Sequence, residues 1–175
     1  SWAILNDMTD KQKSREILKR SIENNFVIQC SFSTAYELFR AMEKADMYSE
    51  TKINMNRWIE LLELECTTCP EEPENGRSEC HAWSALPMYE MIRCMAGIKM
   101  GQTGWESIVI KPHLDYLPDL RGEAFTPKGN IQFCYKKKRG KWNYQVTLPE
   151  GIYGVFILKD GTKKSLKGGQ TYCIS

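Results

Sequence analysis

The hydrophobic pattern of the chain changes once, near residue 101, and this change limits its possible folds more than any other feature. Before that point, apolar residues recur at helical spacing, as they do between positions 35 and 42. Beyond a Gly-Gln-Thr-Gly segment at 101–104, the apolar runs are short and separated by turn pairs. The sequence therefore predicts an α then β chain, with helices over residues 1–102 and a small antiparallel β-sandwich over 103–175.

The two parts should hold four helices and seven strands. A Thr9/Gln12 capping box is expected to open the first helix. In the third helix, apolar residues on two faces, including Ile59 and Leu62, predict a buried C-terminal half. The expected helices span 10–25, 35–45, 50–65 and 84–97, and the expected strands span 107–111, 120–125, 130–137, 141–148, 154–158, 164–166 and 170–174.

Charge and hydropathy exclude two classes of partner. The 175 residues carry 24 basic and 22 acidic side chains, so the formal net charge is only +2. Such a balance provides no overall field that would gather nucleic acid or an anionic membrane. The run Lys136–Arg139 is interpreted as a solvated hairpin turn, and no apolar run approaches the roughly 18 residues of a membrane span. We expect neither a nucleic-acid partner nor a membrane partner.

Seven cysteines, an odd number spread over both halves, do not form the pattern of a disulfide framework. They favour a reducing compartment, and the first ten residues show no signal peptide. A Cys66-x-x-Cys69 pair followed by Cys80-His81 resembles zinc spacing, but Cys80 and His81 are adjacent and acidic residues separate the pairs. Thiol catalysis would require the Cys80 and His81 side chains to meet. Small buried thiols are the favoured interpretation, with no metal and no cofactor.

The segment Cys66–Tyr89 is the candidate functional site. It contains four carboxylates, three cysteines, a histidine and a tryptophan, and it has neither helical nor strand periodicity. It also lies between two apolar helices. Loops held by rigid elements often carry binding and catalytic groups, so we expect chemistry here.

Three segments carry a resemblance to a known family. They are RSECHAWSALPMYE at 77–90, GWESIVIKPHLDYLPDLRGEAFTPKGNIQFCY at 104–135 and LPEGIYGVFILKDG at 148–161. Together they resemble the C-terminal portion of bacterial α-L-rhamnosidases, the inverting glycoside hydrolases of family 78. The resemblance implies the last helices of an (α/α)₆ toroid followed by a β-sandwich. It implies two partners, a rhamnose-containing glycoside and the remainder of the parent catalytic domain.

The resemblance also implies roles for three residues. The family places its general base shortly after a Thr-Thr pair, a position that corresponds to Glu71, and its sugar-binding positions correspond to His81 and Trp83. Cys-Pro precedes Glu71 where the family has an aromatic and a small residue, so Glu72 and Glu74 stay open as the base. The structural alternatives are that the glutamates form a solvated acidic loop, that His81 caps a helix and that Trp83 belongs to the core. The general acid has no counterpart, so the chain alone should be inactive.

Two other functions remain open at this stage. One is a non-catalytic carbohydrate-binding or scaffolding module, which an exposed aromatic row of Tyr135, Trp142 and Tyr144 would favour. The other is a glycosidase of the same architecture with a different sugar specificity, because a fold does not determine the sugar.

Overall fold

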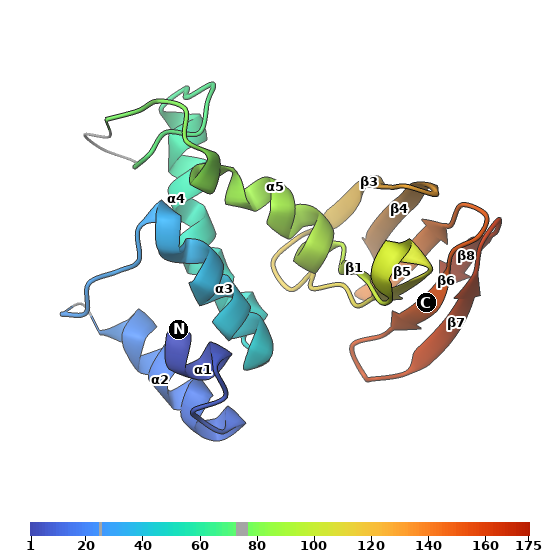
Figure 1. Cartoon of the computed structure of the whole chain (residues 1–175), viewed down its shortest axis with the longest axis horizontal. Helices are drawn as coiled ribbons and strands as arrows, with labels where there is room; N and C mark the ends of the chain where they lie inside the picture. Colours follow the sequence, from blue (N-terminus) through green and yellow to red (C-terminus); the bar gives the residue numbers. More distant parts are fainter. Residues whose placement is uncertain (25, 73–76) are drawn as a thin grey trace. The chain divides into compact units, whose positions relative to one another are not determined.

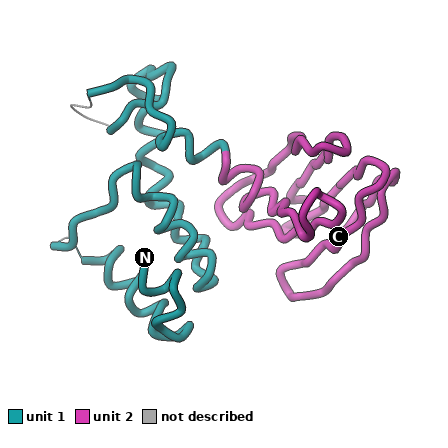
Figure 2. Tube along the Cα trace, viewed as in Figure 1, with its two compact units in different colours: residues 1–88 teal, residues 89–175 magenta. Residues whose placement is uncertain are grey.

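A computed structural model describes residues 1–24, 26–72 and 77–175. The chain divides into two compact units, residues 1–88 and residues 89–175 (Figure 2). Helices make up the first unit and strands dominate the second, so the predicted order of α then β is confirmed. The expected division between residues 102 and 103 concerns the domains of a longer parent protein and stays a prediction.

The first unit contains three helices of ten or more residues and several short turns. Asp10, and not the predicted Thr9 and Gln12 pair, caps the first long helix, because the Asp10 carboxylate accepts a hydrogen bond of 2.7 Å from the Lys13 backbone N–H. Thr9 instead lies 2.8 Å from the Ser14 hydroxyl. The elements, labelled in part in Figure 1, are α1 (Trp2–Leu5), α2 (Lys11–Glu23), η1 (Phe32–Thr34), α3 (Ala35–Lys44), η2 (Tyr48–Glu50), α4 (Thr51–Glu63) and η3 (Ala82–Ala85).

Two apolar clusters hold the first unit together. Leu18 of α2 packs with Ile4 of α1 and with Met42 of α3. The second cluster is aromatic: the rings of Phe32 and Trp58 lie 4.4 Å apart between centroids. Trp58 therefore belongs to the core of α4, in the position from which this helix supports the candidate loop.

The C-terminal half of α4 is not buried on every side. Ile59 is 51% exposed and Leu62 is 72% exposed, so the predicted burial of these two residues is wrong for this chain. Trp58 and Leu61 face the core of the unit. The described residues of the first unit do not cover the other face.

The predicted helix over 84–97 consists of shorter pieces. After η3 the chain forms α5 (Leu86–Glu90) and then a π-helical turn, η4 (Met91–Met95). Gly97 ends the turn with a positive φ of 73°, as its predicted role as a helix terminator requires. None of the helices that the structure describes is long and apolar enough to cross a bilayer.

The second unit contains two four-stranded sheets. One has the order β1 (Ile98–Met100), β2 (Ser107–Ile110), β6 (Tyr153–Ile157) and β7 (Lys163–Lys167). The other has the order β3 (Asp119–Thr126), β4 (Gly129–Lys138), β5 (Lys141–Thr147) and β8 (Thr171–Ile174). All neighbouring strands are antiparallel except β2 and β6, which are parallel. The expectation of a purely antiparallel sandwich is corrected at this pair, where β3 to β5 form the crossover that a parallel pair requires.

Both sheets contribute to one core. Ile131, Phe133 and Tyr135 alternate along β4 and face inward, and Ile108 and Phe156 come from the other sheet. The Tyr135 hydroxyl donates a hydrogen bond of 3.1 Å to the Ala96 carbonyl, which satisfies its polar end inside the core. Burial raises the pKa of Tyr135 well above its ordinary value. The alternation leaves the opposite face of this sheet exposed to solvent and mostly polar, with Phe125 of β3 as an exposed aromatic ring.

Candidate functional site

The candidate loop folds back on itself in two short antiparallel segments. The His81 N–H donates to the Cys69 carbonyl at 2.6 Å, and the Glu71 N–H donates to the Ser78 carbonyl at 2.8 Å. The Thr68 hydroxyl adds a hydrogen bond to the Glu79 carbonyl. These bonds bring residues near Glu71 and residues near His81 together, although an intervening segment separates them in sequence.

A buried serine anchors the folded loop to α4. The Ser84 hydroxyl donates to the carbonyl of Pro70, the residue before Glu71. The Ser84 carbonyl in turn accepts a hydrogen bond of 2.8 Å from the Trp58 indole N–H. The backbone that carries Glu71 is therefore tied through Ser84 to a core residue of α4.

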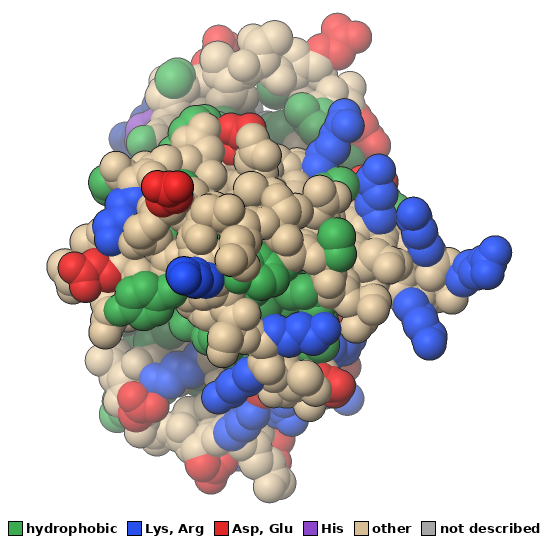
Figure 3. Space-filling model, turned by 90° about the vertical axis from the view of Figure 1, so that its right-hand side faces the viewer, with side chains coloured by type: hydrophobic (Ala, Val, Ile, Leu, Met, Phe, Trp, Pro, Cys, Tyr) green, Lys and Arg blue, Asp and Glu red, His purple; other side chains and the backbone are tan. Residues whose placement is uncertain are grey.

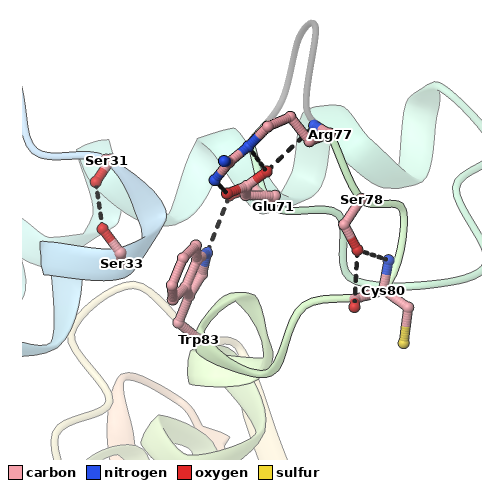
Figure 4. A network of polar contacts seen from close by, with 7 residues as sticks. All are labelled: Ser31, Ser33, Glu71, Arg77, Ser78, Cys80 and Trp83. Carbon is pink, nitrogen blue, oxygen red and sulfur yellow. Dashed lines mark hydrogen bonds and ion pairs between the residues drawn. The ribbon is translucent and has the colours of Figure 1, made fainter.

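Glu71 is buried, with 6% of its surface exposed, and Arg77 satisfies its charge. The guanidinium donates to both carboxylate oxygens, at 2.5 Å from Nη2 to Oε1 and at 3.2 Å from Nε to Oε2 (Figure 4). The Arg77 backbone N–H also donates to Oε2, at 3.1 Å. The side-chain hydrogen bonds from Arg77 lower the pKa of Glu71 and outweigh the effect of burial, which raises it. The carboxylate is therefore held ionised.

His81 and Trp83 lie beside this carboxylate-bearing segment. The centroids of their rings are 3.9 Å apart with planes inclined by 35°, so the two rings are in close, tilted contact. The Trp83 indole N–H donates to the Glu71 carbonyl at 3.1 Å, a contact drawn in Figure 4. Trp83 remains 41% exposed, so it is not a core tryptophan, and part of its ring is open to a ligand.

Of the alternative bases, Glu72 is exposed to solvent and Glu74 lies outside the described residues. Arg77 received no role in the sequence interpretation, because its pairing with Glu71 depends on the closure of the loop. The sequence feature that could have identified Arg77 is its position at the start of the Arg-Ser-Glu-Cys-His segment, six residues after Glu71.

The acidic residues before the loop make structural contacts. Asp10 caps α2, Asp7 pairs with Lys44 at 2.7 Å, and Asp46 pairs with Lys11. The geometry therefore provides one buried, ionised carboxylate beside a histidine and a tryptophan whose rings are in contact. Such a set can accept a proton from water and hold a polar, partly apolar ligand such as a sugar.

Within residues 1–24, 26–72 and 77–175, no group of three His, Cys, Asp or Glu side chains is placed to hold a metal ion. Cys66, Cys69 and Cys80 carry free thiols. The zinc interpretation of the Cys66-x-x-Cys69 pair therefore receives no support from the geometry of the described part of the chain.

The aromatic row that would favour a binding module is not exposed. Tyr135 and Tyr144 are buried in the core of the second unit, and Trp142 is half-buried and packs against that core. These three rings do not form a platform on which a sugar could stack.

Comparisons with known proteins point to one family. Residues 97–172 match the family described as the bacterial alpha-L-rhamnosidase C-terminal domain. The fold is similar to a GH78 family rhamnosidase of Bacillus sp. GL1, with a TM-score of 0.79 and 25% identity over 95% of this chain and 19% of that one. The chain is thus similar to the C-terminal portion of such enzymes, and the resemblance inferred from the sequence is confirmed.

Two further rhamnosidases share the fold. That of Aspergillus terreus gives a TM-score of 0.73 at 15% identity, over 94% of this chain and 21% of that one. That of Streptomyces avermitilis, solved in complex with L-rhamnose, gives 0.67 at 14% identity, over 79% and 17%. A comparison with curated proteins gives no match. The chain spans about a fifth of the length of these enzymes.

Proposed function

On the premise that the chain corresponds to the C-terminal portion of a family 78 α-L-rhamnosidase, we propose that it completes an inverting glycoside hydrolase that releases terminal α-L-rhamnose. In this proposal the helices of the first unit are the last of an (α/α)₆ toroid, whose earlier part lies upstream in the parent protein. The exposed Ile59 and Leu62 of α4 support it, because they offer an apolar surface that the missing helices would cover.

Glu71 serves as the general base, and the observation that carries the proposal is the ion pair that this buried carboxylate forms with the exposed Arg77. An inverting enzyme needs one ionised carboxylate to activate water and one carboxylic acid, about 6.5–9.5 Å away, to protonate the leaving oxygen. An ionised carboxylate offers about four acceptor positions. Arg77 uses three of them, which leaves one for the attacking water.

His81 and Trp83 hold the sugar in this proposal. The exposed part of the indole packs against the apolar face of a deoxy sugar, and the imidazole bonds a hydroxyl group. The contact between the two rings, together with the hydrogen bond from Trp83 to the Glu71 carbonyl, sets the position of the sugar relative to the base. A different sugar specificity remains the second candidate, since the same two side chains would suit other deoxy sugars.

The test compares the 175-residue chain with the parent protein that includes its upstream residues. The parent is expected to hydrolyse an aryl α-L-rhamnoside, with the inverted anomer seen first by proton NMR. The isolated chain is expected to show no turnover above buffer, because it lacks the general acid. Turnover by the isolated chain, or retention of configuration by the parent, would contradict the proposal. Rates on a panel of other aryl glycosides test which sugar the enzyme prefers.

Arg77→Met in the parent should shift the acidic limb of the kcat/KM profile to higher pH. The substitution removes the guanidinium that lowers the pKa of Glu71 and leaves the burial that raises it. The active form is the ionised carboxylate, so activity is lost at a higher pH as the solution is acidified. The small stabilisation from the pair is present above the unfolded pKa, near 4.3, and is lost as pH falls through the lower folded value.

Arg20→Met on α2 is the matched control, because it removes the same charge from an exposed position of the same unit. Its pH profile should coincide with that of the unmodified parent. A profile for Arg77→Met that also coincides would show that Glu71 is not the group titrating on the acidic limb.

A further inference from the structure

The outer face of the β3-β4-β5-β8 sheet carries rows of polar side chains. Alternation along each strand points these residues away from the core. The strand register aligns Arg121, Cys134, Gln145 and Cys173 in one row across the four strands. The neighbouring row, nearer the β4–β5 hairpin, contains Asp119, Lys136 and Asn143.

This face is hollowed along its length. One depression of about 340 Å³ is lined near the hairpin by Lys136, Lys138 and Asn143, among others. A second, of about 480 Å³, extends to Arg121. Both depressions include Gln145, so they meet over the middle of the sheet. Together they form a shallow, open groove across the sheet.

The hairpin end of the groove is positively charged and lacks counterions. The three lysines of this end, Lys136, Lys138 and Lys141, form no ion pair with any residue that the structure describes, and neither does Arg121 in the middle of the sheet. Lys138 and Lys141 lie directly opposite each other in the strand register, where like charges are destabilising. A bound anion would relieve this repulsion.

The carboxylates on the same face do not neutralise this end. Glu123 lies at the other end of β3, where it accepts hydrogen bonds of 2.8 Å from Asn130 and 3.1 Å from Gln132. Asp119 is opposite Lys136 in the register and contributes one negative charge against the three lysines of the hairpin end. The hairpin end therefore carries a net positive charge.

The whole second unit shares this bias, which the net charge of the chain conceals. Residues 89–175 contain 14 Lys and Arg against 7 Asp and Glu, whereas residues 1–88 contain 10 against 15. Figure 3 shows Lys and Arg side chains standing out along one margin of the face that it draws, with fewer Asp and Glu among them. A polyanion would be attracted to the second unit despite the small net charge of the chain.

We propose that this groove binds an acidic polysaccharide, with Lys136, Lys138, Lys141 and Arg121 pairing with uronate carboxylates. Asn143 and Gln145 present both donors and acceptors, which suit sugar hydroxyls, whereas phosphate oxygens can only accept. Single-stranded nucleic acids are usually held by several exposed aromatic rings. Tyr135 and Tyr144 of this sheet are buried, and the exposed ring of Phe125 lies at the end of β3 away from the lysines. The proposal rests on this face alone and does not depend on the proposed hydrolysis.

The test measures binding of the 175-residue chain to polygalacturonate by isothermal titration calorimetry. Fully methyl-esterified polygalacturonate, which has the same backbone without the charges, should not bind. The double variant Lys136→Gln/Lys138→Gln should weaken binding about tenfold, as expected for the loss of two exposed ion pairs. Arg121→Gln provides a second variant from another strand and should weaken binding in the same direction.

The matched control is Lys163→Gln/Lys164→Gln on β7, which removes two exposed charges from the other sheet. It should change the affinity by less than twofold. An equal loss of affinity in both double variants would show that net charge alone attracts the polysaccharide, and it would overturn the proposal that the groove is the binding site. Absence of binding to polygalacturonate, or tighter binding to single-stranded DNA or to phosphatidylserine vesicles, would overturn the proposal as well. Hydrolysis is not measured, so this result is independent of the proposed activity.

Discussion

Glu71→Gln in the parent protein is expected to lower kcat on an aryl α-L-rhamnoside by about 10³-fold, within the range typical of a lost general base. Glutamine keeps the shape of the side chain and its carbonyl oxygen still accepts a hydrogen bond from Arg77. It cannot take a proton from water, because its amide is not basic. Initial rates with saturating substrate give the measurement, and a thermal melt shows whether the variant remains folded.

Glu72→Gln is the matched control, since it makes the same change one residue further along the loop at an exposed position. Its kcat should stay within about threefold of the unmodified value, as for a surface charge without a catalytic role. If Glu72→Gln abolished turnover and Glu71→Gln preserved it, the base would lie at Glu72. Glu71 would then be a structural partner of Arg77.

Gly97→Ala should be among the most destabilising single substitutions in the second unit, with a cost of about 3 kcal/mol or more. Gly97 has a positive φ of 73°, which disfavours any residue with a Cβ. In addition, a Cβ would overlap the Lys111 carbonyl and lie 2.5 Å from the Pro112 nitrogen. This close approach follows from the β1–β2 pairing, in which the Lys111 N–H donates to the Gly97 carbonyl at 3.0 Å.

Gly104→Ala separates the cost of the positive φ from the cost of the close contact with Lys111. Gly104 has a similar φ of 80°, but a Cβ there would meet nothing within 4 Å. Its substitution should cost only the backbone term, about 1–2 kcal/mol. Urea unfolding of the 175-residue chain, followed by circular dichroism, compares the two variants. Equal losses of unfolding free energy in Gly97→Ala and Gly104→Ala would mean that the close contact with Lys111 does not contribute to the cost.

Strong local periodicity explains which parts of the fold were predictable. The apolar spacing of α3 and the alternation of β4 and β5 identified those elements to within a residue or two. β1 was missed because it has only three residues and follows the helix terminator Gly97 directly. The parallel pairing of β2 with β6 was missed because register between distant strands leaves no local pattern.

The candidate site was predictable to a lesser degree. The family resemblance pointed to Glu71, His81 and Trp83, and the described geometry places the three in one cluster. Their roles in catalysis and sugar binding stay predictions. The Arg77 pairing depends on the fold of the loop, and the exposure of Ile59 depends on which helices surround α4. Neither property is contained in the sequence around the residue concerned.

The parallel β2–β6 pair has a consequence for the order of folding. As the chain leaves the ribosome, β2 emerges before the whole of β3, β4 and β5, and its partner β6 follows only after them. Such non-local pairing slows folding, and the β2 edge facing β6 stays unpaired in the meantime. We therefore expect the hairpins of the other sheet to form first during synthesis. The nascent chain would be most prone to aggregation just before β6 is complete.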